Sequence, residues 1–302
     1  MQRSIGCQSA LSSVQNERAL HGWSIILPKG WGMPFFSSLT YTGTRIGGQR
    51  ECRTQHFEAN SLSFPNDYPT TAAHDKAYKR MKISEIAKWS KKPSAKRPNW
   101  EKLGVDYPWH LNWESILGYE NLREDRNLTS TQRFGAETNH EPLQSDIKPW
   151  LLRGPETRSI LNEIIHSKDH SLCLRRRMES LRSSRMLRSD QNTDNSSLLN
   201  SALIMVSLDF PYRGAPESFA FICQPTEEES DAFYEDPKAF KMYLRQTERG
   251  ESEELIAASE VDSDTVIGYV TTGHYSLSIG KCRAIGAISL LQLIQLMGRA
   301  QR

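Results

Sequence analysis

Hydrophobic and polar positions predict three kinds of local structure in the first part of the chain, after a small and polar lead-in over residues 1–21. The run WSIIL at residues 23–27 predicts a short β-strand. Glycines and prolines predict a loop over residues 28–34. Apolar and aromatic side chains separated by Ser, Thr and Gly predict a helix with small contact residues over residues 35–48.

A helix with one basic face is predicted over residues 74–92. Lysines and arginines project from one side of it, and apolar residues at helical spacing form a stripe on the other: Tyr78, Met81, Ile86 and Trp89. Pro93 and Pro98 end regular structure and leave an extended basic strip beside Trp100.

The second half of the chain predicts a helix followed by strands. Residues 158–188 fit a helix that becomes strongly basic towards its end, and residues 189–197 fit a linker. Strands are predicted at 202–210 and 218–224, and a strand pair with a glycine turn at 265–277. From residue 287 onwards, a helix with a narrow polar line is expected to be nearly surrounded by protein.

Composition and charge place few limits on function. The 302 residues suit about two domains, and the net charge of +2 averages over strongly charged blocks. Five scattered cysteines without a CxxC spacing indicate a reducing compartment rather than a disulfide framework or a zinc ribbon. The start of the chain lacks the apolar centre of a secretory signal, and no run approaches the length of a membrane span. We therefore expect a soluble protein.

No catalytic motif emerges from residue spacing. His166 and His170 lie four apart, but the glutamate of an HExxH zinc site is missing, which favours two solvated histidines and no metal site. The glycines around Gly47 and those before Lys281 do not have the spacing of phosphate-binding loops, and no GxSxG elbow is present. A catalytic residue is therefore not predicted.

Two basic segments remain as candidates for nucleic-acid contact. Between Lys76 and Lys102 there are about ten Lys or Arg against about two Glu, interleaved with aromatic residues that suit base stacking. Arginines gather again between residues 175 and 188, and guanidinium groups suit phosphates and RNA bases. Residue types alone leave two interpretations open for these segments, nucleic-acid contact and a solvated helix face.

Two separated blocks resemble one protein family. The segment GWSIILPKGWGMPFFSSLTYTGTRIGG (residues 22–48), followed by FEANSLSFPNDYPTTAA (57–73), resembles the POPLD region of the largest protein subunits of eukaryotic ribonuclease P and ribonuclease MRP. YRGAPESFAFICQP (212–225) and VIGYVTTGHYSLSIGKCRAIGAISL (266–290) resemble the C-terminal part of the same family. The blocks follow the family's order and cover about 100 residues, while residues 102–200 match weakly.

The resemblance implies a fold and a domain order. It implies an α+β fold, with the POPLD region at 22–110, a variable and partly helical basic region at 111–200, and a β-rich domain at 201–302. This last domain is expected to be similar to the folate-binding aminomethyltransferase (T-protein) fold and incomplete at its C-terminus. The long basic N-terminal half of the family is absent, so the chain looks like a C-terminal portion.

The resemblance also implies a role. Family members are noncatalytic RNA-binding scaffolds of the nucleus and nucleolus, in particles whose RNA, with bound magnesium, matures the 5′ end of precursor tRNA or processes precursor rRNA. The expected partners are ribonuclease P RNA, MRP RNA, other protein subunits and, indirectly, precursor tRNA, without a cofactor on this chain. The alternative is a folate-binding aminomethyltransferase-like enzyme, for which no acid or base is found.

Candidate residues follow from the basic segments and from the quoted motifs. Trp23, Trp31, Phe35 and Phe36 are expected to form a buried packing knot that fixes nearby cations against RNA. The candidate RNA contacts are Lys29, Arg45, Arg50, Arg53, Lys79, Arg80, Lys91, Lys92, Lys96, Arg97, Arg175, Arg176 and Arg177. The candidate structural positions are Trp23, Pro28, Gly30, Trp31, Gly32, Gly47, Gly48, Phe64, Pro65, Asp67, Gly268, Gly273 and Gly280.

Overall fold

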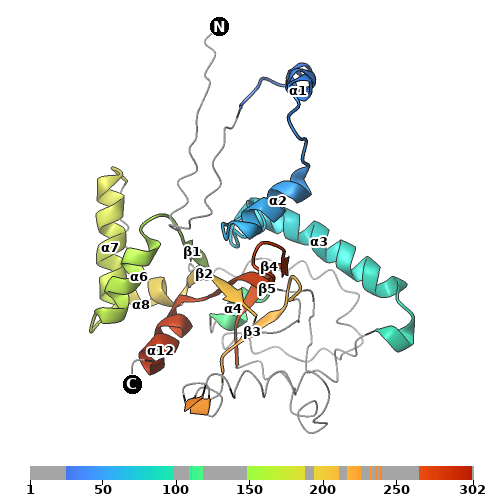
Figure 1. Cartoon of the computed structure of the whole chain (residues 1–302). Helices are drawn as coiled ribbons and strands as arrows, with labels where there is room; N and C mark the ends of the chain where they lie inside the picture. Colours follow the sequence, from blue (N-terminus) through green and yellow to red (C-terminus); the bar gives the residue numbers. More distant parts are fainter. Residues whose placement is uncertain are drawn as a thin grey trace.

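One mixed β-sheet organises the chain, with helices on both sides of it (Figure 1). The structure is a computed structural model, and it describes residues 25–97, 109, 111–117, 148–187, 194–210, 216–225, 231–232, 235–236, 239 and 265–300. Helices and strands together confirm the α+β class in this part of the chain. The likeness to the T-protein fold stays a prediction.

Within the residues that the structure describes, the sheet has five strands in the order β1-β2-β5-β4-β3. They are β1 (Trp150–Leu152), β2 (Ala202–Asp209), β3 (Phe221–Cys223), β4 (Val266–Ser276) and β5 (Lys281–Ser289). β1 runs parallel to β2, and the other neighbours are antiparallel. The predicted strand pair within 265–277 is wrong, because Gly273 pairs with Ala284 inside one long strand and the turn comes later, where Gly280 has a φ of 71°.

Four helices cover one side of the sheet near β1 and β2. They are α6 (Thr157–His166), α7 (His170–Ser184), α8 (Asn195–Asn200) and α12 (Leu290–Ala300). Ile164 and Leu174 are fully buried there, and they belong to the same apolar cluster as Ile204 of β2 and Ile288 of β5. This cluster is the main core, because apolar area removed from water is the dominant stabilising contribution.

The predicted helix over residues 158–188 is two helices. α6 ends at His166, and α7 begins after Asp169, whose carboxylate accepts a hydrogen bond from Leu172 N at 3.0 Å. The capping aspartate starts a second helix with its own axis, whereas periodicity alone suggests a single continuous helix. The His170 ring bonds the Ile164 carbonyl oxygen at 2.7 Å, so His166 and His170 do not share one helix face.

The other flank of the sheet carries α2 (Gln49–Glu58), α3 (Ala72–Lys91) and α4 (Trp113–Ile116), with the short turn η1 (Ser94–Lys96) after α3. The predicted helix over 74–92 is confirmed as α3, and its start is fixed by the Thr71 hydroxyl, which accepts from His74 N. Trp113 of α4 packs edge-on against Tyr269 of β4, with ring centroids 5.1 Å apart. The flank with the basic helix α3 and the flank with the apolar core therefore belong to the same sheet.

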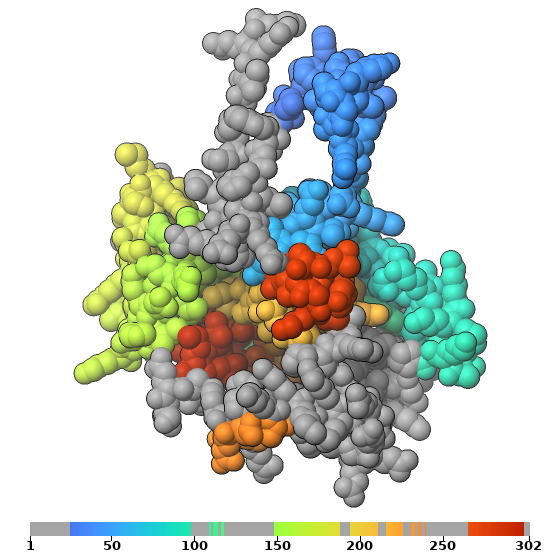
Figure 2. All heavy atoms as spheres, viewed as in Figure 1, coloured from blue at the N-terminus to red at the C-terminus, as the bar shows by residue number. Residues whose placement is uncertain are grey.

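The first helix, α1 (Gly32–Tyr41), lies apart from this body at the top of Figures 1 and 2. The predicted packing knot is wrong for its described members, because Trp31, Phe35 and Phe36 are 57%, 41% and 46% exposed. Trp23 lies outside the described residues. Ile25 to Leu27 form no strand, and the helix ends at Tyr41 rather than continuing to Gly48. The spacing of apolar residues predicts that α1 has an apolar side, but it does not show whether another part of the chain covers that side.

Candidate nucleic-acid interface

A buried carboxylate joins the segment before α3 to strand β4. Asp67 is 1% exposed and accepts a hydrogen bond from Ser63 N at 2.8 Å within its own turn. Its Oδ1 also accepts from the hydroxyls of Thr271 and Thr272, at 2.6 and 2.8 Å. Residues more than 200 positions apart thus share one buried acceptor, which is stable only because its partners replace the lost water.

A second carboxylate holds the turn between β4 and β5 against α2. Glu58 accepts from Leu277 N at 2.9 Å, from Ser278 N at 3.2 Å, from the Ser276 hydroxyl at 2.6 Å and from the Ser278 hydroxyl. Partial burial raises the pKa of Glu58, but these hydrogen bonds outweigh it and lower the pKa to about 2. Beside it, the rings of Phe57 and His274 lie 3.7 Å apart.

The Glu58 contacts predict an acid-sensitive contribution to stability. A carboxylate whose folded pKa is depressed stabilises the fold above its unfolded pKa of about 4.5 and loses this contribution as the pH falls towards 2. We expect Glu58→Gln to lower the free energy of unfolding by about 1 kcal/mol at pH 6 and by much less near pH 2.5. Urea unfolding of both proteins at the two pH values measures this. A difference independent of pH contradicts it.

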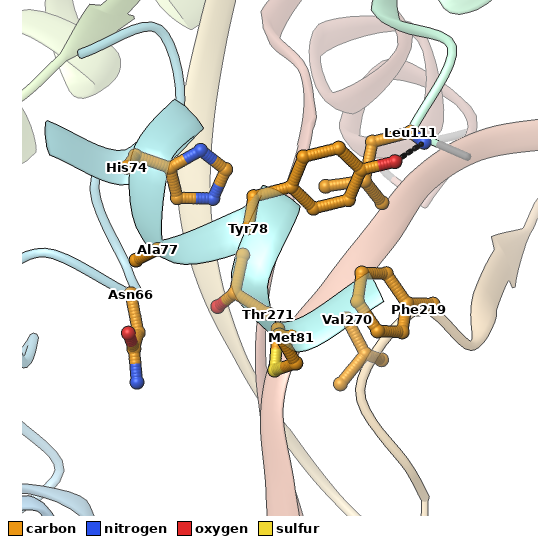
Figure 3. A pocket seen from close by; sticks show the side chains of 9 residues that line it. All are labelled: Asn66, His74, Ala77, Tyr78, Met81, Leu111, Phe219, Val270 and Thr271. Carbon is orange, nitrogen blue, oxygen red and sulfur yellow. Dashed lines mark hydrogen bonds between the residues drawn. The ribbon is translucent and has the colours of Figure 1, made fainter. Parts of the chain in front are cut away.

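The inner side of α3 packs on the sheet through Tyr78 (Figure 3). The Tyr78 hydroxyl donates to the Trp109 carbonyl oxygen at 2.7 Å and accepts from Leu111 N at 3.0 Å. Burial raises the pKa of Tyr78 to about 12, so the hydroxyl keeps its proton at neutral pH. The small cavity beside it, of about 10 Å³, has room for about one water molecule and none for a folate.

Burial of the inner side turns the opposite side of α3 to solvent. His74, Tyr78, Met81 and Trp89 lie towards the protein, and burial lowers the pKa of His74. The outer side carries exposed cations that form no ion pair with any residue the structure describes: Lys76, Lys79, Arg80 and Lys91. The predicted basic face is therefore present on α3, which runs along one flank of the molecule in Figure 2.

The end of α3 separates the predicted cations into two kinds. Lys92 and Lys96 are exposed beside the helix end. The Arg97 guanidinium instead donates to the Lys92 carbonyl oxygen at 2.7 Å and to the Ser90 carbonyl oxygen at 2.6 Å. It also lies 4.8 Å from the Trp89 ring centroid. Arg97 thus ends the helix, because it satisfies carbonyl groups that have no partner within α3.

The structure does not bring the remaining predicted cations to this face. Arg175 bonds Glu179 and Asn195, and Arg177 bonds Glu156, all within the α6–α8 region. These helices lie on the other side of the sheet from α3 in Figure 1. Arg176 is exposed on α7, while four further cations are exposed in and around α1 and α2: Lys29, Arg45, Arg50 and Arg53.

The predicted structural positions also fall into two groups. A Cβ on Gly268 would lie 2.1 Å from the Ala287 oxygen, and one on Gly273 would lie 2.4 Å from the Pro216 oxygen. Backbone contacts, with β5 at Gly268 and with Pro216 before β3 at Gly273, therefore exclude a side chain at both. Phe64 and Pro65 form a cis peptide in the turn that ends with Asp67. Around α1, other positions are exposed and contact no core: Pro28, Gly30, Trp31, Gly32, Gly47 and Gly48.

Comparison with known proteins finds two family models along the chain. The POPLD (NUC188) domain matches residues 22–113, and the POP1 C-terminal domain matches residues 236–302. Two separate parts of the chain are therefore similar to these two domains, in the order POPLD and then POP1 C-terminal. The carboxylates Asp67 and Glu58 lie in the first match and their hydroxyl donors in the second, so the two family domains meet at the hydrogen bonds described above.

Relatives of the family are similar over most of this chain. The human protein named Ribonucleases P/MRP protein subunit POP1 is 24% identical over 379 aligned residues, 91% of this chain and 37% of that protein. The Saccharomyces cerevisiae protein of the same name is 24% identical, over 88% of this chain and 33% of its own length. Ribonucleases P/MRP protein subunit popl-1 of Caenorhabditis elegans is 23% identical, over 84% and 28%. The chain spans about a third of these curated relatives.

Sequence reasoning missed the polar residues that join the two family domains. Glu58, Thr271, Thr272 and Ser276 have no local signal, because a buried acceptor is recognisable only when its donors from a distant segment are known. In the described part of the chain, no helix has the length and apolar character needed to cross a bilayer. Nor do three His, Cys, Asp or Glu residues gather there as a metal site would require.

Proposed function

We propose that this chain is an RNA-binding scaffold subunit of the ribonuclease P/MRP ribonucleoprotein and supports precursor tRNA 5′-end maturation and precursor rRNA processing. The names of the relatives support the particle. One observation supports the RNA-binding surface, namely the solvated row of cations on α3. The chain itself carries no catalytic role in this proposal.

The geometry of α3 suits the phosphates of a folded RNA. Lys76, Lys79, Arg80 and Lys91 extend over a helix about 30 Å long, and Lys92 and Lys96 continue the row beyond it. The inner side is fixed by Tyr78, so the cations sit on a rigid support. Cations that need not break an internal ion pair can replace counterions on RNA without an added cost.

In this proposal the chemistry belongs to the RNA and its magnesium ions, and the chain binds no cofactor of its own. Its expected partners are the ribonuclease P and MRP RNAs, the other protein subunits and, indirectly, precursor tRNA. The expected location is the nucleus, including the nucleolus. No observation in the described residues favours the folate-dependent alternative, and the cavity at Tyr78 is too small for that ligand.

Charge removal on α3 tests the RNA-binding surface. We expect Lys79→Gln, Arg80→Gln and Lys91→Gln together to weaken binding of ribonuclease P RNA and to lower the log-log salt slope by about 2 to 3, because about 0.7 to 0.9 counterions are released per phosphate contact. Filter binding at about 50 to 300 mM KCl gives both the affinity and the salt slope.

A matched control removes the same charge elsewhere. Arg158, Lys168 and Arg185 are exposed in the α6–α7 region, on the other side of the sheet from α3 (Figure 1), and their triple glutamine variant has the same net charge as the α3 variant. We expect it to keep most of the affinity and the slope. Equal losses in both variants would show that only net charge matters, and no loss in either would overturn the proposal.

A further inference from the structure

The most apolar exposed surface of the described chain is α1 with its flanks. No residue of α1 is buried. Its side chains contribute a broad apolar surface open to water: Ile25, Ile26, Trp31, Met33, Phe35, Phe36, Leu39 and Tyr41. Phe35, Phe36 and Leu39 share one side of the helix, as residues three or four apart do. An exposed apolar surface of this kind marks an interaction site in a folded protein.

The hydroxyl groups of α1 do not make this surface polar. Ser38 donates to the Pro34 carbonyl oxygen at 3.0 Å, Thr40 to the Phe36 oxygen at 2.8 Å and Thr42 to the Leu39 oxygen at 2.6 Å. These three hydroxyls are thus used within α1 and its C-cap. Residues 30–44 also contain no charged side chain. A helix with a broad exposed apolar side needs a covering layer of protein.

Charge at the two ends of α1 indicates what kind of protein surface covers it. Lys29 precedes α1, and Arg45, Arg50 and Arg53 follow it, all exposed, while residues 25–53 contain one acidic side chain, Glu51. We propose that α1 docks in an apolar groove of a different protein chain, with acidic groups at the rim of the groove. Apolar side chains supply the affinity and the four cations fix the orientation, as in other helix-in-groove complexes.

The same observations disfavour RNA and a second copy of this chain as the partner of α1. RNA presents phosphates, and the 15 residues from Gly30 to Thr44 offer them no cation. A second copy would bring the same excess of positive charge against this one, which is repulsive. The inference does not depend on RNA binding by α3, and it reassigns Lys29, Arg45, Arg50 and Arg53 from RNA contacts to a protein contact.

Photo-crosslinking in cells that express the chain tests the occupant directly. We expect benzoylphenylalanine at Phe36 to give a protease-sensitive, nuclease-resistant product, whose mapped peptide belongs to another protein and lies beside Asp or Glu. The control position is Ile83, which is 69% exposed on the cationic side of α3 and is expected to give a nuclease-sensitive product. A peptide of this same chain, RNA, lipid or no product at Phe36 overturns the inference. A failure at Ile83 alone counts against the RNA-binding proposal instead.

A paired variant separates docking from folding. Phe36→Asp with Leu39→Asp is expected to reduce recovery of the mapped partner about tenfold or more, because a buried anchor carries much of the binding energy. The melting temperature is expected to stay within about 1 °C of the parent, because α1 contributes no buried residue to the fold. Arg45→Glu with Arg53→Glu is expected to weaken recovery more at low salt than at high salt. Unchanged recovery with the first variant, or a recovery loss explained by a lower melting temperature, overturns docking by α1.

Discussion

Asp67→Ala is expected to lower the free energy of unfolding by about 3 kcal/mol, because three donors lose a charged acceptor inside the protein. Ser63 N and the hydroxyls of Thr271 and Thr272 would then be left with a cavity instead of a carboxylate. For a chain of this size the loss corresponds to about 6 to 12 °C in melting temperature. Differential scanning calorimetry of the purified chain measures it.

Asp75→Ala is the matched control for Asp67→Ala. Asp75 is 65% exposed in the first turn of α3, so its removal is expected to cost about 0.5 kcal/mol through the lost charge near the helix N-terminus. The loss in free energy of unfolding for Asp67→Asn is expected to fall between those of the two alanine variants. Its amide oxygen still accepts from the threonines, while its amino group cannot accept from Ser63 N. Similar melting temperatures for Asp67→Ala and Asp75→Ala would contradict the role given to Asp67.

Gly268→Ala is the second substitution for which we expect a large loss of stability. A methyl group there would lie 2.1 Å from the Ala287 carbonyl oxygen and 2.6 Å from Ile288 Cγ2 of the neighbouring strand. The carbonyl is held in the ladder between β4 and β5, so it cannot move without loss of strand pairing. We expect a loss of about 2 to 3 kcal/mol, as for other substitutions that overfill a packed interior. Urea unfolding of the variant measures the loss.

Gly298→Ala provides a control with the opposite sign. Gly298 lies in α12 with no atom within 4 Å of the position its Cβ would take. Alanine is the better helix former, so the variant is expected to gain up to about 1 kcal/mol. If both glycine variants changed stability in the same direction, the close approach of β4 and β5 would not be the cause.

The hydrogen bonds between the two family domains fix the orientation of α3. Asp67 and Glu58 hold the POPLD region against the C-terminal strands, so the cationic side of α3 keeps its direction relative to the sheet. Arg175 and Arg177 of α7 pair with Glu179 and Glu156 and belong to a different part of the molecule. A scaffold of this kind can present one face to RNA and leave α1 for a protein neighbour.

Local sequence patterns predicted several elements correctly. The helix over 74–92 and the strand at 202–210 correspond to α3 and β2, because each contains a full period of buried and exposed positions. Patterns failed where a distant segment decides the outcome. The run 265–277 contains a single strand because β5 pairs with it from Gly268 to Ser276. β1 was missed because three residues carry too short a pattern.

Sequence alone determined the resemblance to the POPLD-containing family and the existence of a basic helix face, since each depends on residue types in a short stretch. Only the tertiary structure decided which cations face solvent together, that Arg97, Arg175 and Arg177 serve internal bonds, and that Trp31 and Phe36 lie uncovered. The physical reason is that charge pairing and burial depend on neighbours far away in the chain, and a local pattern holds no record of those neighbours.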